Sequence, residues 1–527
     1  MISKKAIRAF KKRRMENYKW MKKISREDLE AEIKPLRWKA RFSFKTVPYL
    51  HQLVCFYIGI CVDRFMFELD MGLGKTKIVL DVLWYKKRVS NLKKVLVLVP
   101  ETLNIEGWEE QILEHSRFVV VPMYGTTKDR WELISEHEHG VFVLTYAAAM
   151  HMVCKLTKIK GKKKQQRKPN KALIRRLARG VDAIVLDESH ATKNSKSVTY
   201  RICNALSNLI PICYELTGTP FGRDPSDFWA QFHIMDKGET LGSSLGLMRE
   251  SYFKKEEGYF GGKWVFDPKN ERAFHKRIQN RSIRYNDNEC GDLPERIDIK
   301  TRYLLPPVNM EFYVSAIDGI IKAKGDYREL ENSFVKLRQI CSGFIQYKSR
   351  TGMSEVIIFD ENPKLEAARE FLRSLPIDSN VVVFYEFKPS GDALEAMVKA
   401  EGLSYSVARG GMKDKIVKEI KRFKAGKSRV LIANWRSAAE GGNFQKVSNY
   451  VVFYESPVSP IKRRQCVKRV WRSGQERRCY IYDLVMAGKS SIEQRILEFL
   501  EEGESLFQAI VEGKTSLKEL LLENEDD

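Results

Sequence analysis

Residues 65-FMFELDMGLGKTKIVLDVLW-84 decide the fold class of this chain, because an apolar run is followed by a glycine-rich turn and a second apolar segment. The first run predicts a buried strand and the second predicts a helix. Four residues match the end of a phosphate-binding loop: Gly72, Gly74, Lys75 and Thr76. In such a loop, backbone amides surround the phosphates, the lysine reaches the β- and γ-phosphates, and the hydroxyl holds Mg²⁺. The stretch therefore predicts an α/β domain that binds ATP and Mg²⁺.

One residue departs from the phosphate-loop pattern, since Leu69 stands where G-x-x-x-x-G-K-T has its first glycine. A glycine-rich turn without a nucleotide is the alternative interpretation. The stretch 181-VDAIVLDESHATKN-194 argues against it, because this second apolar strand ends in Asp187 and Glu188. In an ATPase, Asp187 would bind Mg²⁺ and Glu188 would activate the attacking water. An acidic turn that caps a helix is the competing interpretation of this carboxylate pair.

The composition excludes several classes of protein. The 527 residues are 43% hydrophobic, which is too apolar for a wholly disordered chain. No apolar run reaches about 18 residues, and no apolar segment follows the basic N-terminus, so we expect neither a membrane span nor a secretory signal. The nine cysteines are scattered singly, so a disulfide framework is not expected, and a reducing compartment such as the cytosol is favoured. We expect the cytosol of a bacterium, an archaeon or a virus-infected cell, and the nucleus stays open.

The net charge of +24 is concentrated in two short segments. Residues 1–24 carry +9 and residues 151–180 carry +12, whereas residues 501–527 carry −7. Basic runs are either solvated surface or binding sites for phosphate groups. The first segment has apolar residues at near-helical spacing, and the second has no apolar period in its middle, so it is expected to form an exposed loop. A polyanion is the partner that this charge favours.

Three segments together resemble the Snf2 family of double-stranded-DNA translocases within superfamily 2 of the helicase-like ATPases. They are 70-DMGLGKT-76, 187-DESHATKNSKS-197 and 216-LTGTP-220. The resemblance implies that Thr217 and Thr219 couple the nucleotide site to the DNA groove. It also implies that Gln52, in 49-YLHQ-52, reads the adenine base, for which an ordinary glutamine at a helix start is the alternative.

The resemblance further implies where the first lobe meets DNA. Thr102 and Thr145 follow buried strands and would contact the DNA backbone, although each could equally be an ordinary strand-to-turn junction. The basic run 155–179 lies between Thr145 and Asp187 and is longer than the connection usual in the family. We expect this insertion to bind DNA phosphates through five residues in particular: Lys162, Lys163, Lys164, Arg167 and Lys168.

The strongest signal in the second half is 465-QCVKRVWRSGQ-475, which fits the family pattern Q-x-x-x-R-x-x-R. Gln465, Arg469 and Arg472 occupy the patterned positions. Two arginines three residues apart would share one helix face and could stabilise charge on the γ-phosphate. A basic surface helix is the alternative. Upstream, Gly441 and Asn443 hold two places of the family's glycine-rich coupling loop, in which alanines replace two glycines.

The resemblance covers about residues 45–505 and implies two RecA-like α/β lobes with mainly parallel sheets flanking an ATP cleft, plus helical insertions. The expected organisation has five parts: a basic extension over 1–44, lobe 1 over 45–225 with the basic insertion 155–179, helical protrusions and an inter-lobe linker over 226–350, lobe 2 over 351–500, and an acidic tail over 501–527.

The function expected from the resemblance is ATP-driven movement along duplex DNA, with remodelling of protein–DNA complexes or branched DNA. A strand-separating or branch-migration helicase would use the same motifs and needs only an added wedge. A nucleotide-dependent DNA-binding scaffold with little turnover is a third interpretation, which the intact catalytic residues argue against. A protein partner could bind the basic N-terminal segment or the acidic tail, and no membrane is expected to take part. The pathway, the preferred DNA structure and the oligomeric state leave no signal in the sequence.

Overall fold

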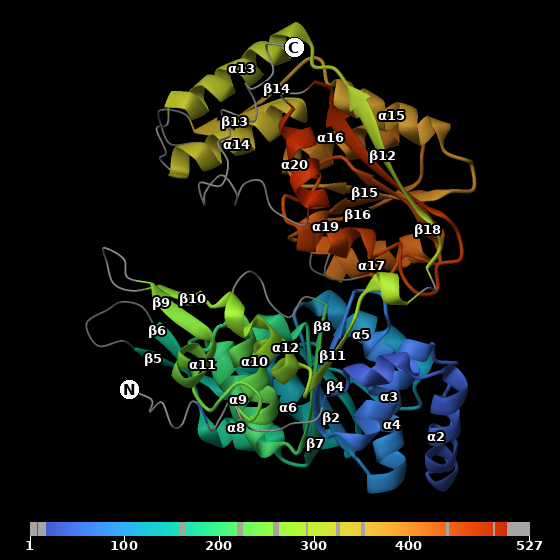
Figure 1. The fold of residues 1–527 in the computed structure, drawn as a ribbon. Coiled ribbons are helices and arrows are strands. Elements are labelled where there is room, and N and C mark those ends of the chain that lie inside the picture. Colours follow the sequence, from blue (N-terminus) through green and yellow to red (C-terminus); the bar gives the residue numbers. More distant parts are fainter. Residues whose placement is uncertain are drawn as a thin grey trace. The chain divides into compact units, whose positions relative to one another are not determined.

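The chain is divided into two structural units, with the boundary between residues 291 and 292 of the sequence, and each unit contains one parallel β-sheet (Figure 1). The computed structural model describes residues 8, 17–158, 165–218, 225–256, 263–290, 293–322, 327–348, 354–412, 414–438, 442–488 and 491–502. Within these residues, no helix combines the length and the apolar character that a membrane crossing requires. Five residues or segments named above lie outside the described residues: Lys162–Lys164, Thr219, Gly441, most of residues 1–16, and the tail from 503.

The sheet of unit 1 has seven strands that are parallel throughout, as predicted. Their order is β11 (Ser282–Tyr285), β1 (Arg64–Leu69), β8 (Ile212–Thr217), β7 (Val181–Asp187), β2 (Lys94–Val99), β4 (Gly140–Thr145) and β3 (Val120–Pro122). Alternate residues of a strand enter different cores, since Phe65 and Phe67 pack on one face and Met66 packs on the other. A sheet covered on both faces needs such continuous apolar strands.

Helices cover both faces of this sheet. One face packs against η1 (Lys19–Lys23), α2 (Arg26–Lys39), α3 (Leu50–Cys61), α4 (Lys75–Ser90) and α5 (Thr102–His115). The other packs against α6 (Thr127–Glu136), α7 (Tyr146–Val153), α8 (Lys171–Ala178), α9 (Val198–Leu209), α10 (Asp227–Asp236), α11 (Leu245–Tyr252) and α12 (Glu271–Ile278). Short 3₁₀ turns are η2 (Ser189–Thr192), η3 (Pro268–Asn270) and η4 (Asp287–Glu289).

The N-terminal boundary differs from the prediction, because residues 17–44 belong to the core of unit 1. Met21 and Leu29 are buried in the same cluster as the sheet residues, and Tyr18 packs edge-on against Phe65 with ring centroids 5.3 Å apart. The near-helical spacing of its first apolar residues does not by itself show what they pack against. The basic extension therefore does not reach residue 44.

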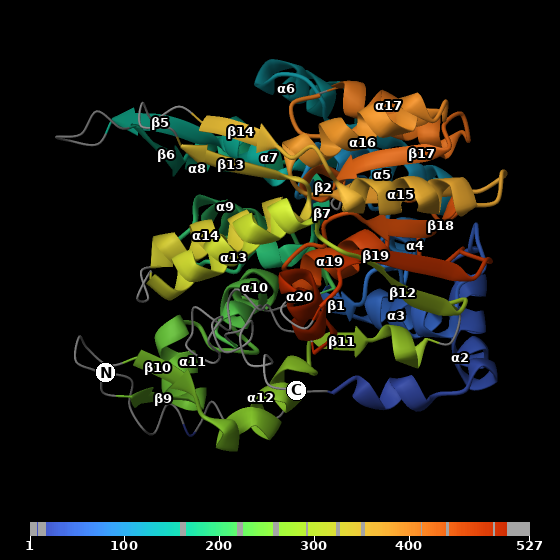
Figure 2. The same cartoon turned by 90° about the horizontal axis from the view of Figure 1, so that it is seen from above.

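The basic insertion 155–179 also differs from the prediction of an exposed loop. It contains an antiparallel hairpin, β5 (Cys154–Lys158) with β6 (Gln165–Pro169), followed by α8. The Asn170 side chain caps α8 by accepting hydrogen bonds from two backbone amides. Backbone pairing between two polar strands leaves no apolar period, so pattern analysis missed this hairpin. In Figures 1 and 2 it lies at the end of unit 1 opposite α2.

The predicted inter-lobe segment 226–350 is divided between the two units. Its first part packs onto unit 1, where α10, α11 and α12 contribute to the core and β11 extends the sheet. A second hairpin, β9 (Phe253–Glu256) with β10 (Lys263–Phe266), belongs to the same part. The rest belongs to unit 2, because β12 (Arg296–Tyr303) is an edge strand of the second sheet.

The sheet of unit 2 has six strands and is again parallel throughout. Their order is β12, β19 (Cys479–Met486), β18 (Ser448–Phe453), β15 (Asn380–Tyr385), β17 (Val430–Asn434) and β16 (Tyr405–Ala408). Its helices are α13 (Pro307–Lys322), α14 (Tyr327–Cys341), α15 (Pro363–Ser374), α16 (Lys388–Ala400), α17 (Asp414–Lys424), α18 (Trp435–Ala438), α19 (Pro460–Val467) and α20 (Ile492–Glu501). A hairpin pairs β13 (Phe344–Lys348) with β14 (Ser354–Ile358).

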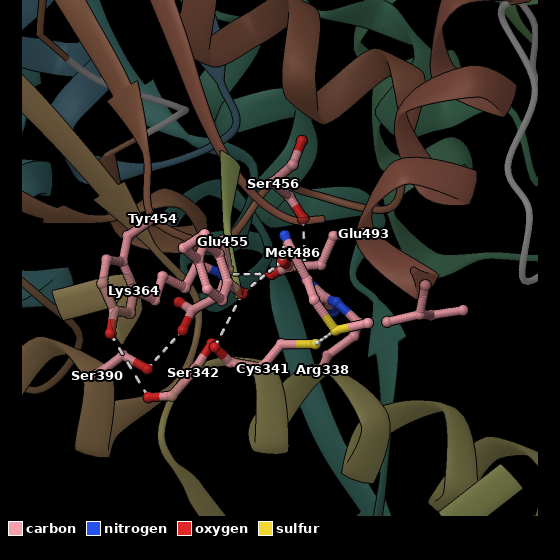
Figure 3. Close-up of polar contacts among 12 residues, drawn as sticks. Arg338, Cys341, Ser342, Lys364, Ser390, Tyr454, Glu455, Ser456, Met486 and Glu493 are labelled. Carbon is pink, nitrogen blue, oxygen red and sulfur yellow. Dashed lines mark hydrogen bonds and ion pairs between the residues drawn. The ribbon is translucent and has the colours of Figure 1, made fainter. Parts of the chain in front are cut away.

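A buried polar network ties the helices α15, α16 and α20 to strands β12 and β19 and to the segment that follows β18 (Figure 3). The fully buried Lys364 ammonium pairs with Glu493, and the same carboxylate accepts hydrogen bonds from the Tyr303 hydroxyl at 2.7 Å and the Met486 amide at 2.9 Å. Close by, the Ser390 hydroxyl donates to Glu455. A buried ion pair tolerates its desolvation only when further hydrogen bonds complete it, as they do here.

Candidate nucleotide-binding site

The phosphate loop joins the end of β1 to the start of α4. Gly72 and Gly74 both take left-handed backbone conformations, with φ of 89° and 81°. A side chain at Gly74 would collide with the Gln52 amide, so glycine is required there for two reasons. Lys75 and Thr76 begin α4, which directs the helix N-terminus toward the loop.

The lysine of the loop is held by the strand in front of it. The Lys75 Nζ donates to the Leu69 carbonyl oxygen at 2.9 Å. Gly218 lies against the same place, because a Cβ on that residue would come 3.3 Å from the Leu69 oxygen and 3.5 Å from the Lys75 Nζ. The end of β8, which carries the fully buried Thr217, therefore adjoins the phosphate loop.

Gln52 lies beneath the loop rather than at the surface. It is 3% exposed, its amide oxygen accepts from the Tyr49 amide at 3.1 Å, and its Nε2 donates to the Leu73 carbonyl at 3.2 Å. The neighbouring His51 Nε2 lies 2.9 Å from the same Leu73 oxygen. The structure thus gives Gln52 a supporting contact with the phosphate loop, which the sequence did not indicate.

The acidic pair ends β7, two strands away from β1. The Asp187 Oδ2 accepts a hydrogen bond from the Trp108 indole at 2.8 Å, and its Oδ1 accepts one from the Glu188 amide at 3.1 Å. Glu188 has a left-handed backbone with φ of 48°, which is an uncommon conformation for a non-glycine residue. His190 lies 3.3 Å from the Glu188 carboxylate.

The electrostatics of this pair favour a bound cation. Burial, and then the neighbouring Glu188 carboxylate, raise the pKa of Asp187 to about 6, while Trp108 and Lys75 act in the opposite direction. Two carboxylates crowded in a buried place share a proton or bind a cation. No group of three or more His, Cys, Asp or Glu side chains in the described segments could hold a metal ion by itself. Mg²⁺ fits such a site, because it is usually bound by one or two carboxylates together with substrate phosphates.

The side chains predicted to contact DNA have different roles in the folded unit. Thr145 caps α7 by accepting a hydrogen bond from the Ala148 amide at 3.0 Å, and the Tyr146 hydroxyl donates to the Asp187 main-chain oxygen at 2.9 Å. Thr102 is exposed at the start of α5. On β6, Lys168 is exposed and Arg167 lies 2.9 Å from the His151 ring.

In unit 2 the two arginines lie after α19 rather than on it. The helix ends at Val467, and the Arg469 and Val470 amides then make tighter i→i−3 bonds. The Arg469 carbonyl accepts from the Phe444 amide at 2.7 Å, and this contact between the loop and the helix end replaces a further helical turn. The prediction of one shared helix face is therefore wrong.

The same contact brings the predicted coupling loop and the arginines together. The Arg472 guanidinium donates to the Asn443 side chain, and Arg469 donates to the Gly442 carbonyl at 3.4 Å. Gln465 is 5% exposed, and its amide oxygen has no hydrogen-bond partner in the described part of unit 2. A buried acceptor of this kind is typical of a site that a ligand or water completes.

Sequence reasoning missed the buried partners of the acidic motif. The Trp108 indole and the Tyr146 hydroxyl both bind Asp187, and the Ser189 hydroxyl donates to the Gln231 side chain on α10 at 2.9 Å. One signal could have found the first two, because a buried tryptophan or tyrosine usually needs a partner for its polar atom.

Comparison with known proteins identifies the family. The model of the SNF2-related domain matches residues 18–341, and the model of the helicase conserved C-terminal domain matches residues 363–474. The uncharacterized ATP-dependent helicase YqhH of Bacillus subtilis is 24% identical over 84% of this chain and 75% of its own length. The RAD54-like DNA repair and recombination protein of Drosophila grimshawi is 23% identical over 85% of this chain, which spans 60% of that relative.

Two solved structures are similar over most of the chain. The SWI2/SNF2 ATPase core of Sulfolobus solfataricus in complex with dsDNA is 20% identical, with a TM-score of 0.40 over 91% of this chain and 96% of that one. The helicase domain of Pyrococcus furiosus Hef is 14% identical, with a TM-score of 0.47 over 86% of this chain and 98% of that one. Because the SNF2-related model matches more than half of the residues, this chain belongs to the SNF2-related family of helicase-like ATPases.

Proposed function

We propose that this protein hydrolyses ATP with Mg²⁺ and uses the cycle to move along duplex DNA, remodelling protein–DNA complexes or branched DNA. The observation that carries this proposal is the meeting of the phosphate loop and the half-buried acidic pair at one edge of the unit 1 sheet. Lys75 influences the pKa of Asp187, so the phosphate-binding and cation-binding groups share one electrostatic environment.

In the proposed chemistry each unit contributes different groups. The amides of Gly72 to Lys75 and the Lys75 ammonium bind the phosphates, Thr76 and Asp187 hold the Mg²⁺, and Glu188 takes the proton of the attacking water. Bound Mg²⁺ would neutralise charge on the phosphates. The negative charge that develops on the γ-phosphate is stabilised by Arg469 and Arg472 of unit 2, in the role of arginine fingers, together with Gln465 of the same motif.

The DNA part of the proposal rests on charge and on family membership. The names of the matched proteins refer to a helicase, to DNA repair and recombination, and to a complex with dsDNA. In unit 1 the β5–β6 hairpin and α8 carry exposed basic residues, among them Lys155, Lys168, Lys171, Arg175 and Arg179. These residues suit a groove of DNA phosphates, so we propose the insertion as an accessory DNA contact.

The deciding experiment measures the ATPase rate of the full chain against duplex, single-stranded and forked DNA and against RNA. We expect stimulation by duplex DNA, and Glu188→Gln should bind ATP but lower kcat by roughly 10²–10⁴-fold. Stimulation only by forked DNA would favour the strand-separating helicase. Absence of stimulation by any nucleic acid would favour the binding scaffold, and full turnover in Glu188→Gln would overturn the role of that residue.

The accessory contact is tested separately by charge removal. Lys155→Gln combined with Lys168→Gln should weaken duplex binding severalfold and reduce the slope of log K against log salt by about 0.9 for each DNA phosphate that the variant no longer neutralises. Lys34→Gln on α2, which removes an exposed lysine at the opposite end of unit 1, is the matched control (Figure 1). An unchanged slope in the double variant would exclude the hairpin from the DNA interface.

A further inference from the structure

We propose that Trp108 and Tyr146 are positioning residues that hold Asp187 in its catalytic orientation and connect it to the helices that follow β2 and β4. Trp108 acts on the side chain, because its indole N–H donates to the Asp187 Oδ2 at 2.8 Å. Tyr146 acts on the backbone, because its hydroxyl donates to the Asp187 main-chain oxygen at 2.9 Å. Together they restrain the carboxylate and the main-chain carbonyl of Asp187.

Both contacts are partly buried and come from buried aromatic residues, and a hydrogen bond shielded from water is worth more than one in water. Trp108 is 2% exposed and Tyr146 is 8% exposed, and they belong to the two different cores on either side of the sheet. The second oxygen of Asp187 accepts the Glu188 amide at 3.1 Å, so each carboxylate oxygen has one donor. Each oxygen still has lone-pair capacity for a cation, in a direction that these donors set.

The origin of the two side chains gives the contacts a second consequence. Strands β7, β2 and β4 are neighbours in the sheet, and their carboxyl ends lead into the acidic motif, α5 and α7 respectively. Trp108 is on α5 and Tyr146 is the first residue of α7. A displacement of either helix therefore changes a hydrogen bond to Asp187.

This second consequence rests on the proposed function and on the expectation from the sequence that Thr102 and Thr145, at the starts of these helices, contact the DNA backbone. DNA that shifts the start of α5 or α7 then acts on Asp187 within unit 1. Stimulation of the ATPase by DNA would have a route through two defined hydrogen bonds.

The positioning role is tested without DNA and without turnover. In the full chain, Trp108→Phe and Tyr146→Phe each remove one hydrogen-bond donor and keep an aromatic ring. We expect Trp108→Phe to weaken binding of a fluorescent non-hydrolysable ATP analogue about tenfold in Mg²⁺, and Tyr146→Phe about threefold. Binding in EDTA should stay unchanged, because only the metal-dependent part uses Asp187. Equal losses with and without Mg²⁺, or no loss, would overturn the role.

Matched controls come from the same two cores. Trp84→Phe changes a tryptophan that packs against the core of Trp108, and Tyr200→Phe removes a hydroxyl that lies 3.0 Å from the His233 ring in the core of Tyr146. We expect both controls to lower the melting temperature without a Mg²⁺-specific loss of binding. A Mg²⁺-specific loss in the controls would overturn the positioning role, because general loosening of the cores would then explain the result.

The route for DNA is tested by the ratio of ATPase rates with and without duplex. We expect this ratio to fall severalfold in Trp108→Phe and in Tyr146→Phe, and to stay at the unaltered value in both controls. An unchanged ratio would overturn the route and leave the positioning role standing. A ratio of one in the unaltered protein would overturn the proposed function, while the binding experiment would still decide the positioning role.

Discussion

The two units are built on the same kind of parallel sheet, but they hold their functional side chains in different ways. In unit 1 the phosphate loop and Asp187 are held by hydrogen bonds from buried side chains, including Gln52 and Trp108. In unit 2 the guanidinium groups of Arg469 and Arg472 contact one loop, at Gly442 and Asn443. The difference is that buried side chains from separate elements support the groups in unit 1, whereas residues 442 and 443 of one loop contact the arginines in unit 2.

The units also differ in how they treat a buried carboxyl group. Glu215 of unit 1 is fully buried beside Ser189, and burial raises its pKa well above the ordinary value. Glu386 of unit 2 is almost as buried, but the attraction of Arg338 and Arg436 outweighs that effect of burial and holds its pKa below the ordinary value. In unit 1 burial therefore favours the neutral form of a carboxyl group, whereas in unit 2 two arginines favour the charged form of one.

The prediction with the largest effect concerns the catalytic role of the arginines in unit 2. Arg472→Ala should lower kcat about 10³-fold or more, because an arginine that stabilises transition-state charge contributes roughly 10³–10⁵-fold. ATP binding to unit 1 should persist in this variant, as measured with a fluorescent nucleotide. Arg478→Ala removes an exposed arginine of the same unit and is the control. Equal kcat values for the two variants would remove Arg472 from the mechanism.

A smaller effect tests the network that holds unit 2 together. Lys364→Met leaves the buried Glu493 without its cation and should destabilise unit 2 by about 3–5 kcal/mol in urea unfolding. Arg373→Met breaks the solvent-exposed pair with Glu401 and should shift the unfolding midpoint far less. Similar shifts for both would mean that burial does not set the strength of these pairs.

The prediction with the smallest effect concerns the raised pKa of the buried Glu215 in unit 1. Because the pKa of Glu215 is raised on folding, the folded protein binds an extra proton above the unfolded pKa, and the stability of the protein falls as pH rises through this range. Glu215→Gln removes this loss, so its melting temperature should gain on that of the unaltered protein as the pH rises above about 4.5, the ordinary value for a glutamate. Thermal melts over this range measure the gain, and a constant difference would contradict the raised pKa.

Much of the fold followed from the sequence, because apolar strands alternate with helices and each phosphate or acid motif follows a strand. Misplaced segments share one property. The β5–β6 hairpin is made by backbone pairing of polar residues, and residues 17–44 contribute apolar residues that lie among many charges. The hairpin leaves no apolar period, and the near-helical spacing near the N-terminus does not show which surface that segment packs against. The split of 226–350 depends on β11 and β12 joining different sheets, which is a long-range event.

The candidate site was harder to predict from the sequence than the fold. Lys75, Asp187, Arg469 and Arg472 could be named because their residue types and spacings match the chemistry of phosphate binding. The residues that hold these groups in place could not be predicted, since Trp108 and Asp187, for example, are 79 positions apart in the chain. The end of α19 also escaped prediction, because the Phe444 amide that binds the Arg469 carbonyl lies in a separate loop.

The class of fold, the phosphate loop, the acidic pair and the family follow from the amino-acid sequence, because these depend on local order along the chain. The side chains that hold the catalytic groups and the division between the two units are seen only in the folded chain. A hydrogen bond such as that from Trp108 to Asp187 requires two distant segments to pack before either residue shows its role. The same holds for Glu215, whose raised pKa depends on burial by residues far away in the sequence.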